Sequence, residues 1–334
     1  MWQDMKDWIK EALSNRWQGL KDWLAAVSGE TWKKVALIGV ALAVIYYPLG
    51  MIWSHKIDDD TTAPMAMVTA NAKAGGSRAV DMVSYLIERE VDNHGWVMND
   101  PFLKASSLLD NMPNYQQGMM NAFSRFSIEL RDQIGRTRGS SAADSDLETA
   151  AGLLPYPGDV WIFNFSTSWL PTASAEQQYR KAKTALDIYN ARLAEGVAVY
   201  ERRADNLEAT LDRIAKDVGA STAAVENHIR ERSHDWIDFE ADDLFYNIKG
   251  QAYGYYMILL GLRQDYQSVI AGKELSQAYE QMLESFKQVA VLDPLMVTNG
   301  APDNMIFANH LAVQGFYLMR ARTQLQEVGN ILLK

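Results

Sequence analysis

The sequence predicts an all-α protein: an N-terminal amphipathic helix, a single transmembrane helix and a helical-bundle exterior domain with one long coiled-coil-like helix. Three observations support this fold class. Residues 35–53 form an apolar run of 19 residues without a charge. Through most of the remaining chain, apolar residues recur at three- and four-residue steps, the period of amphipathic helices. Apart from 160–165, the sequence contains no useful run of alternating β-branched residues.

The apolar run at 35–53 predicts the membrane span. As a helix it would be about 28 Å long, close to the hydrocarbon thickness of a bilayer. Lys33 and Lys34 precede it and three acidic residues follow at 58–60. Positive charge stays in the cytoplasm, so we expect a cytoplasmic N-terminus and a C-terminal domain on the exterior side. A cleaved signal peptide and a buried soluble helix are the alternatives, but a leader of 34 residues is long for a signal peptide.

Residues 1–34 predict a tryptophan-rich amphipathic helix. Its apolar positions follow helical spacing, and acidic and basic residues occupy the other face. We expect this helix to lie in the membrane interface. The alternative is that it packs on the cytoplasmic face of a partner protein. The apolar positions are Trp2, Met5, Ile9, Leu13, Trp17, Leu20, Leu24 and Val27.

Charge and composition exclude several classes of function. The formal net charge is −10. Residues 1–56 hold seven of the 32 basic and five of the 42 acidic residues, which leaves 25 basic and 37 acidic residues for the exterior domain. Such an acidic domain argues against a nucleic-acid partner. The chain has no cysteine, which excludes disulfides, thiol catalysis and cysteine-ligated metals.

Beyond the span, residues 54–76 predict a linker because they are polar, small and Pro/Gly-containing. We expect the exterior α-helical domain to cover 77–334, with an irregular insertion at 136–175. In 176–218, apolar residues recur every seven positions, which predicts a long heptad helix. It packs either within the bundle or against a second copy, so a homo-oligomer is one option. The heptad positions are Tyr179, Leu186, Leu193, Tyr200, Leu207 and Ile214.

Carboxylates are the main candidates for a polar site. They are densest just before an apolar helix that begins near residue 242, where they could bind a cation or ligand, or simply cap the helix. The spacing fits no EF-hand, and the chain has no P-loop, nucleophile elbow or dinucleotide motif. We therefore assign no catalytic residue, no metal and no cofactor. The candidates are Asp235, Asp238, Glu240, Asp242 and Asp243, with Asp100 and Asp110 upstream.

A second candidate surface is the aromatic segment at 156–171. Prolines and a glycine make regular helix improbable there, so its large apolar side chains are either tucked onto the bundle or presented to a partner or membrane. The candidate partner-binding residues are Trp161, Phe163, Phe165 and Trp169.

Several segments together resemble a family of uncharacterised proteobacterial proteins. These segments are GWxxNDPF at 95–102, LDNMPN at 109–114, YPGD at 156–159, YNxxL at 189–193 and RRADNL at 202–207. The resemblance implies a bacterial inner-membrane protein of Gram-negative type, with one N-terminal membrane segment, a cytoplasmic N-terminus and a helical periplasmic C-terminal domain. It carries no activity or cofactor. We do not expect it to cover the tryptophan-rich leader.

Two functions fit these observations. The first is a membrane-anchored scaffold or adaptor that binds another envelope or membrane protein. The second is an envelope hydrolase or ligand-binding protein that acts on cell-wall or lipid material through a carboxylate site. The lack of a reactive motif favours the first, and an enzyme is the less expected of the two.

Overall fold

The structure is a computed structural model that describes residues 2–26, 29–138, 144–163, 169–232, 238–300 and 308–334. Within these residues the regular structure is helical, and the sole β pairing is an isolated bridge between Asn299 and Asn309. The predicted all-α fold is therefore confirmed. The chain forms two compact units, Met1–Trp53 and Ser54–Lys334.

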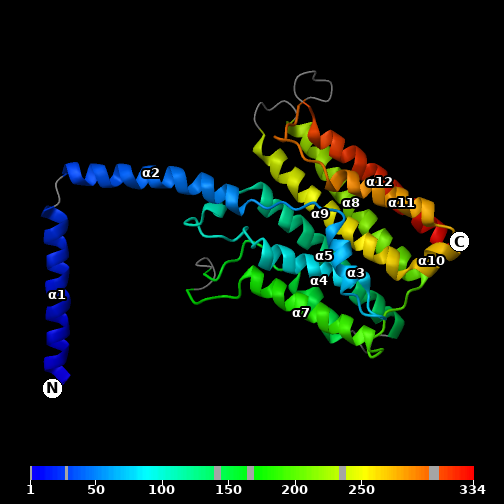
Figure 1. Cartoon of the computed structure of the whole chain (residues 1–334), viewed down its shortest axis with the longest axis horizontal. Helices are drawn as coiled ribbons and strands as arrows, with labels where there is room; N and C mark the ends of the chain where they lie inside the picture. The colour runs from blue at the N-terminus through cyan, green and yellow to red at the C-terminus, as the bar shows by residue number, and fades with distance from the viewer. Residues whose placement is uncertain (1, 27–28, 139–143, 164–168, 233–237, 301–307) are drawn as a thin grey trace. The chain divides into compact units, whose positions relative to one another are not determined.

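The first unit contains helices α1 (Trp2–Ala26) and α2 (Gly29–Ser54) (Figure 1). Helix α2 includes the whole apolar run and has no buried residue. Among the described helices, it is the one with the length and hydropathy to cross a bilayer. Helix α1 exposes Trp8, Leu13 and Trp17.

The second unit, called the body below, is a helical bundle (Figure 1). Its elements in chain order are α3 (Ala63–Ala70), α4 (Arg78–Glu88), the π-helix η1 (Arg89–Asn93), the 3₁₀-helix η2 (Ala105–Leu108), α5 (Asn111–Arg138), α6 (Ser145–Leu153), α7 (Ala175–Ala194), α8 (Ala204–Arg232), α9 (Phe239–Asp265), α10 (Gln267–Gly272), α11 (Ser276–Ala290) and α12 (His310–Leu332).

Helix α9 is the centre of the body. It packs against α4, α5 and α11, while α12 packs on α8 and α11, and α7 packs on α4 and α6. Two glycines let the backbones of α5 and α9 touch. A Cβ atom on Gly250 would lie 2.0 Å from the carbonyl oxygen of Tyr115, and one on Gly118 would lie 2.0 Å from that of Asn247. Larger residues at these two positions would push the helices apart.

The prediction of one continuous heptad helix over 176–218 is wrong. Helix α7 ends at Ala194, and α8 starts ten residues later at Ala204. Gly196 between them has φ +73°, a left-handed conformation that ends helices and favours glycine. The heptad residues still face the core from both helices, since Leu186 and Leu207 are fully buried.

Two segments expected to be irregular contain helices. The predicted insertion at 136–175 holds α6, whose first turn is capped by Asp144 through the backbone N–H groups of Asp146 and Leu147. The predicted linker at 54–76 holds α3, which buries Pro64 and Val68. The linker is therefore part of the body rather than a stalk.

Candidate functional site

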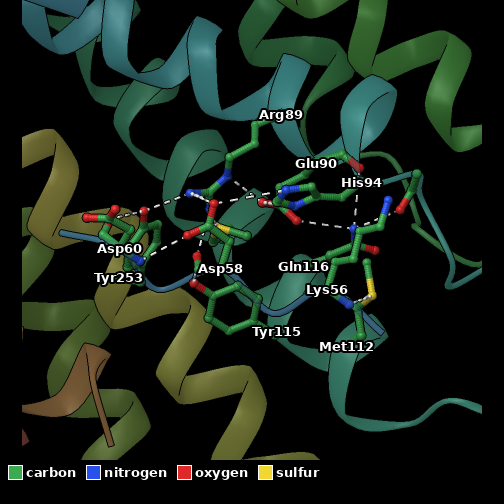
Figure 2. A network of polar contacts seen from close by, with 12 residues as sticks. Lys56, Asp58, Asp60, Arg89, Glu90, His94, Met112, Tyr115, Gln116 and Tyr253 are labelled. Carbon is green, nitrogen blue, oxygen red and sulfur yellow. Dashed lines mark hydrogen bonds and ion pairs between the residues drawn. The ribbon is translucent and has the colours of Figure 1, made fainter. Parts of the chain in front are cut away.

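The most heavily charged buried region of the body binds the chain's own acidic segment, residues 58–60, which follows α2 (Figure 2). We call the side chains that hold this segment the docking site: Arg89, Glu90, Tyr115, Lys249 and Tyr253. They come from α4 and its π-helical extension, from α5 and from α9.

Arg89 and Glu90 continue the buried face of α4, on which Leu86 and Ile87 are also fully buried. At the end of α4 the helix widens into a π-helical turn, and the His94 N–H donates to the carbonyl of Arg89 five residues earlier at 2.8 Å. Arg89, Glu90 and Val91 are all buried in this turn. Such π-helical turns are frequent at functional sites.

The Arg89 side chain binds both the carboxylate and the backbone carbonyl of Asp58. One guanidinium nitrogen lies 3.2 Å from the Asp58 carboxylate, and another donates to the Asp58 carbonyl at 3.0 Å. The hydroxyl of Tyr115 donates to the same carbonyl at 2.9 Å. Arg89 also donates to the hydroxyl of Tyr253 at 2.9 Å and lies over its ring. Asp58 is thus fixed by two buried side chains, Arg89 and Tyr115.

Glu90 is the buried counter-charge of Arg89. It is fully buried, and one carboxylate oxygen accepts from the Arg89 Nε at 2.8 Å. The other accepts from Gln116, which is also fully buried and donates to the Gly95 carbonyl as well. His94 Nδ1 lies 3.3 Å from Glu90. Burial lowers the pKa of Arg89, but Glu90, the two tyrosines and Asp58 raise it by more than burial lowers it. The pKa therefore lies above its usual value, and the guanidinium remains charged.

The remaining acidic residues are held from α9. Lys249, which is 1% exposed, binds the Asp59 carboxylate at 2.9 Å. The hydroxyl of Tyr253 donates to the Asp60 carbonyl at 2.7 Å. The Asp60 carboxylate accepts from Thr62 and Ala63 at the start of α3, and these hydrogen bonds lower its pKa. The buried charges of Arg89, Glu90 and Lys249 are thus each paired with a residue of this chain.

The carboxylates predicted to form a polar site lie in several separate parts of the body. Asp110, Asp242 and Asp243 lie together where α5 and α9 begin. Burial, followed by repulsion from Asp110 and Asp243, raises the pKa of Asp242 to about 6. With its amide nitrogen turned toward the carboxylates, Asn111 donates to Asp242 at 2.7 Å. In the described part of the chain, no three His, Asp or Glu side chains are placed to hold a metal ion.

The other predicted carboxylates have structural roles. Asp238 caps α9 through the backbone N–H of Ala241, and its pKa is lowered because hydrogen bonds from Asn299 and His228 outweigh its burial. Glu240 pairs with Arg232 on the surface. Asp100 binds Lys104 and Ser106 within its own loop. Asp235 lies outside the described residues.

The aromatic segment is neither fully core nor fully exposed. Trp161 is half-buried and packs edge-on against Phe163, with ring centroids 5.5 Å apart. Trp169 is 83% exposed. Phe165 lies outside the described residues. The role of this segment in binding stays a prediction.

Sequence reasoning missed the docking site itself. The signal that could have found it is a charged residue at a position where the helical pattern predicts a buried apolar one. Arg89 and Glu90 continue the apolar face of α4, and Lys249 directly follows Ile248, a residue of the apolar face of α9. Charges at such positions are rarely buried without a partner, so each implies a counter-charge elsewhere in the chain.

A family model described as an uncharacterized protein conserved in bacteria (DUF2333) matches residues 25–235 and 220–334. The chain belongs to the DUF2333 family. The resemblance inferred from the sequence is therefore confirmed at the level of the family. The match to DUF2333 begins at residue 25, so it leaves out most of the tryptophan-rich leader, as expected. No curated protein and no solved structure matches the chain.

Proposed function

We propose that this DUF2333 protein is a membrane-anchored scaffold or adaptor that holds a helical body at the periplasmic face of the inner membrane and binds another envelope or membrane protein. The observation that carries the proposal is the docking site. Two buried cations of the body, Arg89 and Lys249, bind residues 58–60, only a few residues after the apolar helix α2. The connection between the apolar helix and the held segment is therefore short, which suits a scaffold.

Charge supports the proposed topology. Lys33 and Lys34 precede the apolar run, and the acidic segment follows it. The retained positive charge favours a cytoplasmic N-terminus. A reporter enzyme that is active only after export, fused after residue 334, should be active. A reporter that works only in the cytoplasm, fused at the same place, should be inactive, and the reverse pattern would contradict the topology.

Helix α12 offers a surface for a protein partner. Val313, Phe316 and Met319 are spaced three residues apart, which places them on one side of the helix, and they are 46%, 61% and 58% exposed. Helix α12 packs on α8 and α11 with its other side. An apolar row on an outer helix is a typical contact for a partner helix, from another protein or a second copy.

A photo-crosslinking amino acid at Phe316 tests this surface in the full-length protein in native membranes. We expect a discrete adduct of higher mass from position 316 and none from Gln326, an exposed polar position on the same helix. Val313→Glu should abolish the adduct without changing the helical circular dichroism spectrum. Equal labelling at both positions, or no adduct at 316, would argue against a partner on α12.

The hydrolase alternative rests on Asp242, whose raised pKa is typical of a general acid. The structure gives this alternative less support. A cavity of about 410 Å³ is lined by Met65, Leu260, Arg263, Gln264 and Ile270, among others. Its lining includes no carboxylate, and the Asp242 cluster lies at the opposite end of α9.

A further inference from the structure

We propose that the body itself touches the lipid bilayer, through apolar side chains on three loops at the end that carries the acidic segment. We call this end the anchor end. The contact residues are Leu108 before α5, Trp169 and Leu170 before α7, and Leu295 and Met296 after α11. This inference rests on the proposed anchoring by α2 and adds a second membrane contact.

Contacts within the body place all three loops at the anchor end. The backbone N–H of Lys56 lies 3.2 Å from the sulfur of Met112, in the first turn of α5 and directly after the first loop. Lys249 binds Asp59 at 2.9 Å and lies 3.9 Å from Asp293, which begins the third loop. The acidic segment and two of the loops are therefore neighbours.

The second loop is joined to the first across the same end. The side chain of Asn99 donates to the carbonyl of Val160 at 2.9 Å, and Trp96 donates to the carbonyl of Gly158 at 2.8 Å. Within the second loop, the backbone N–H of Thr172 donates to the carbonyl of Ile162. The loops before α5 and before α7 leave the bundle at the same end in Figure 1.

Chain length brings this end to the membrane surface. Asp58 is five positions beyond Trp53, the last residue of the apolar run. A fully extended chain of that length spans at most about 17 Å, of which the polar headgroup region takes up about 5–8 Å. Because Asp58 is held by Arg89 and Tyr115, the anchor end cannot move away from the bilayer without breaking buried contacts.

The exposed side chains have the chemistry of the membrane interface. Leu295 is fully exposed, Trp169 is 83% exposed, and Leu170, Met296 and Leu108 are 74%, 69% and 57% exposed. Tryptophan and leucine are preferred where a protein enters the headgroup region. The nearby carboxylates Asp110 and Asp243 would repel anionic lipid. The fitting partner is therefore the uncharged or zwitterionic bilayer, bound by apolar burial.

The lack of cysteine allows a direct test, because a single introduced cysteine takes a dye at one site. Leu170→Cys and Leu295→Cys probe the anchor end. Val197→Cys is the matched control, an exposed apolar position (63%) beyond the far end of α7. Ala43→Cys reports on α2 itself. Each full-length variant is labelled with an environment-sensitive dye and reconstituted in phosphatidylcholine vesicles, where brominated lipid and aqueous iodide compete as quenchers.

We expect brominated lipid to quench the dyes at 43, 170 and 295, and iodide to quench the dye at 197 several-fold better than those three. High salt should leave this pattern unchanged, since burial drives the contact. Lipid quenching at 43 with only aqueous quenching at 170 and 295 would overturn the bilayer contact while leaving the anchor intact, and a protein partner for these loops would then be the better explanation. Aqueous quenching at 43 would overturn the proposed anchor instead.

Discussion

Replacing Arg89 by methionine is the perturbation that most clearly probes the docking site. Methionine has a similar length and no charge, so the change removes the cation while keeping much of the volume. Arg89 is 4% exposed and its counter-charge Glu90 is fully buried. After the substitution, Glu90 retains the amide of Gln116, but it has lost its guanidinium partner.

The expected loss is large because a buried carboxylate is left without its cation. Breaking a buried ion pair by removing one partner costs about 3–5 kcal/mol in the free energy of unfolding. The loss includes the hydrogen bonds from Arg89 to Tyr253 and to the Asp58 carbonyl, each contributing about 1 kcal/mol. Replacing Glu90 by glutamine as well should recover about 2 kcal/mol, since the uncompensated charge is then gone.

Chemical denaturation of the full-length variants in detergent, followed by circular dichroism, measures these differences. The deficit of the single variant should shrink at acidic pH, because a buried carboxylate without a cation is neutralised by a proton. Two results would refute the proposed pairing. One is a loss in the free energy of unfolding below about 1 kcal/mol for Arg89→Met. The other is a double variant that is clearly less stable than Arg89→Met alone, as expected if the two substitutions act independently.

Three further changes have definite expected results. Lys249→Met should cost less than about 1 kcal/mol, because its partner Asp59 is 35% exposed and can be hydrated instead. Asp242→Asn should stabilise the protein at pH 7 by about 1–2 kcal/mol after allowance for solvent screening. In the wild type the raised pKa of about 6, against a usual 3.8, means that the folded state holds the extra proton and that stability falls as pH rises from about 4 to 6. Asp242→Asn should lose this dependence. Gly250→Ala should lower the melting temperature, because the new Cβ would meet the Tyr115 carbonyl oxygen at 2.0 Å.

Each result has a contradicting outcome. If Lys249→Met were as unstable as Arg89→Met, the exposure of the partner carboxylate would not determine how much stability is lost when the cation is removed. Unchanged pH dependence in Asp242→Asn would mean that another group is responsible, and Asp205→Asn, at an exposed carboxylate, is the matched control. A more stable Gly250→Ala variant would show that the gain in helix propensity outweighs the close approach of α5 and α9.

The sequence predicted what depends on local pattern. The apolar period of 3.6 residues gave the all-α class, and the run at 35–53 lies within one helix. Periodicity could not find the break after α7, because the heptad positions face the core on both sides of it. The decisive residue is Gly196, whose left-handed φ is a single-residue feature inside an otherwise continuous pattern.

The docking site depends on contacts between residues far apart in the chain. Asp58 and Arg89 are 31 residues apart, and Asp60 and Tyr253 are 193 apart. Composition marked residues 54–76 as a linker because they are small and polar, but their polar groups are used for binding to the body. Similarly, the sequence identified Asp110 and Asp242 as separate candidates, and only the packing of α5 on α9 brings them together.

The most direct test of the central claim is the rate of backbone hydrogen exchange just after α2. The N–H groups of Asp60, Thr62 and Ala63 donate to carboxylates within this segment at 2.7–3.1 Å. In the full-length protein in lipid nanodiscs, exchange of these N–H groups should be slower than in an unstructured peptide by on the order of 100-fold, and Arg89→Met should remove most of this protection. Exchange at the unstructured rate in the wild type would show that the segment is a free stalk, and that the docking site does not hold it.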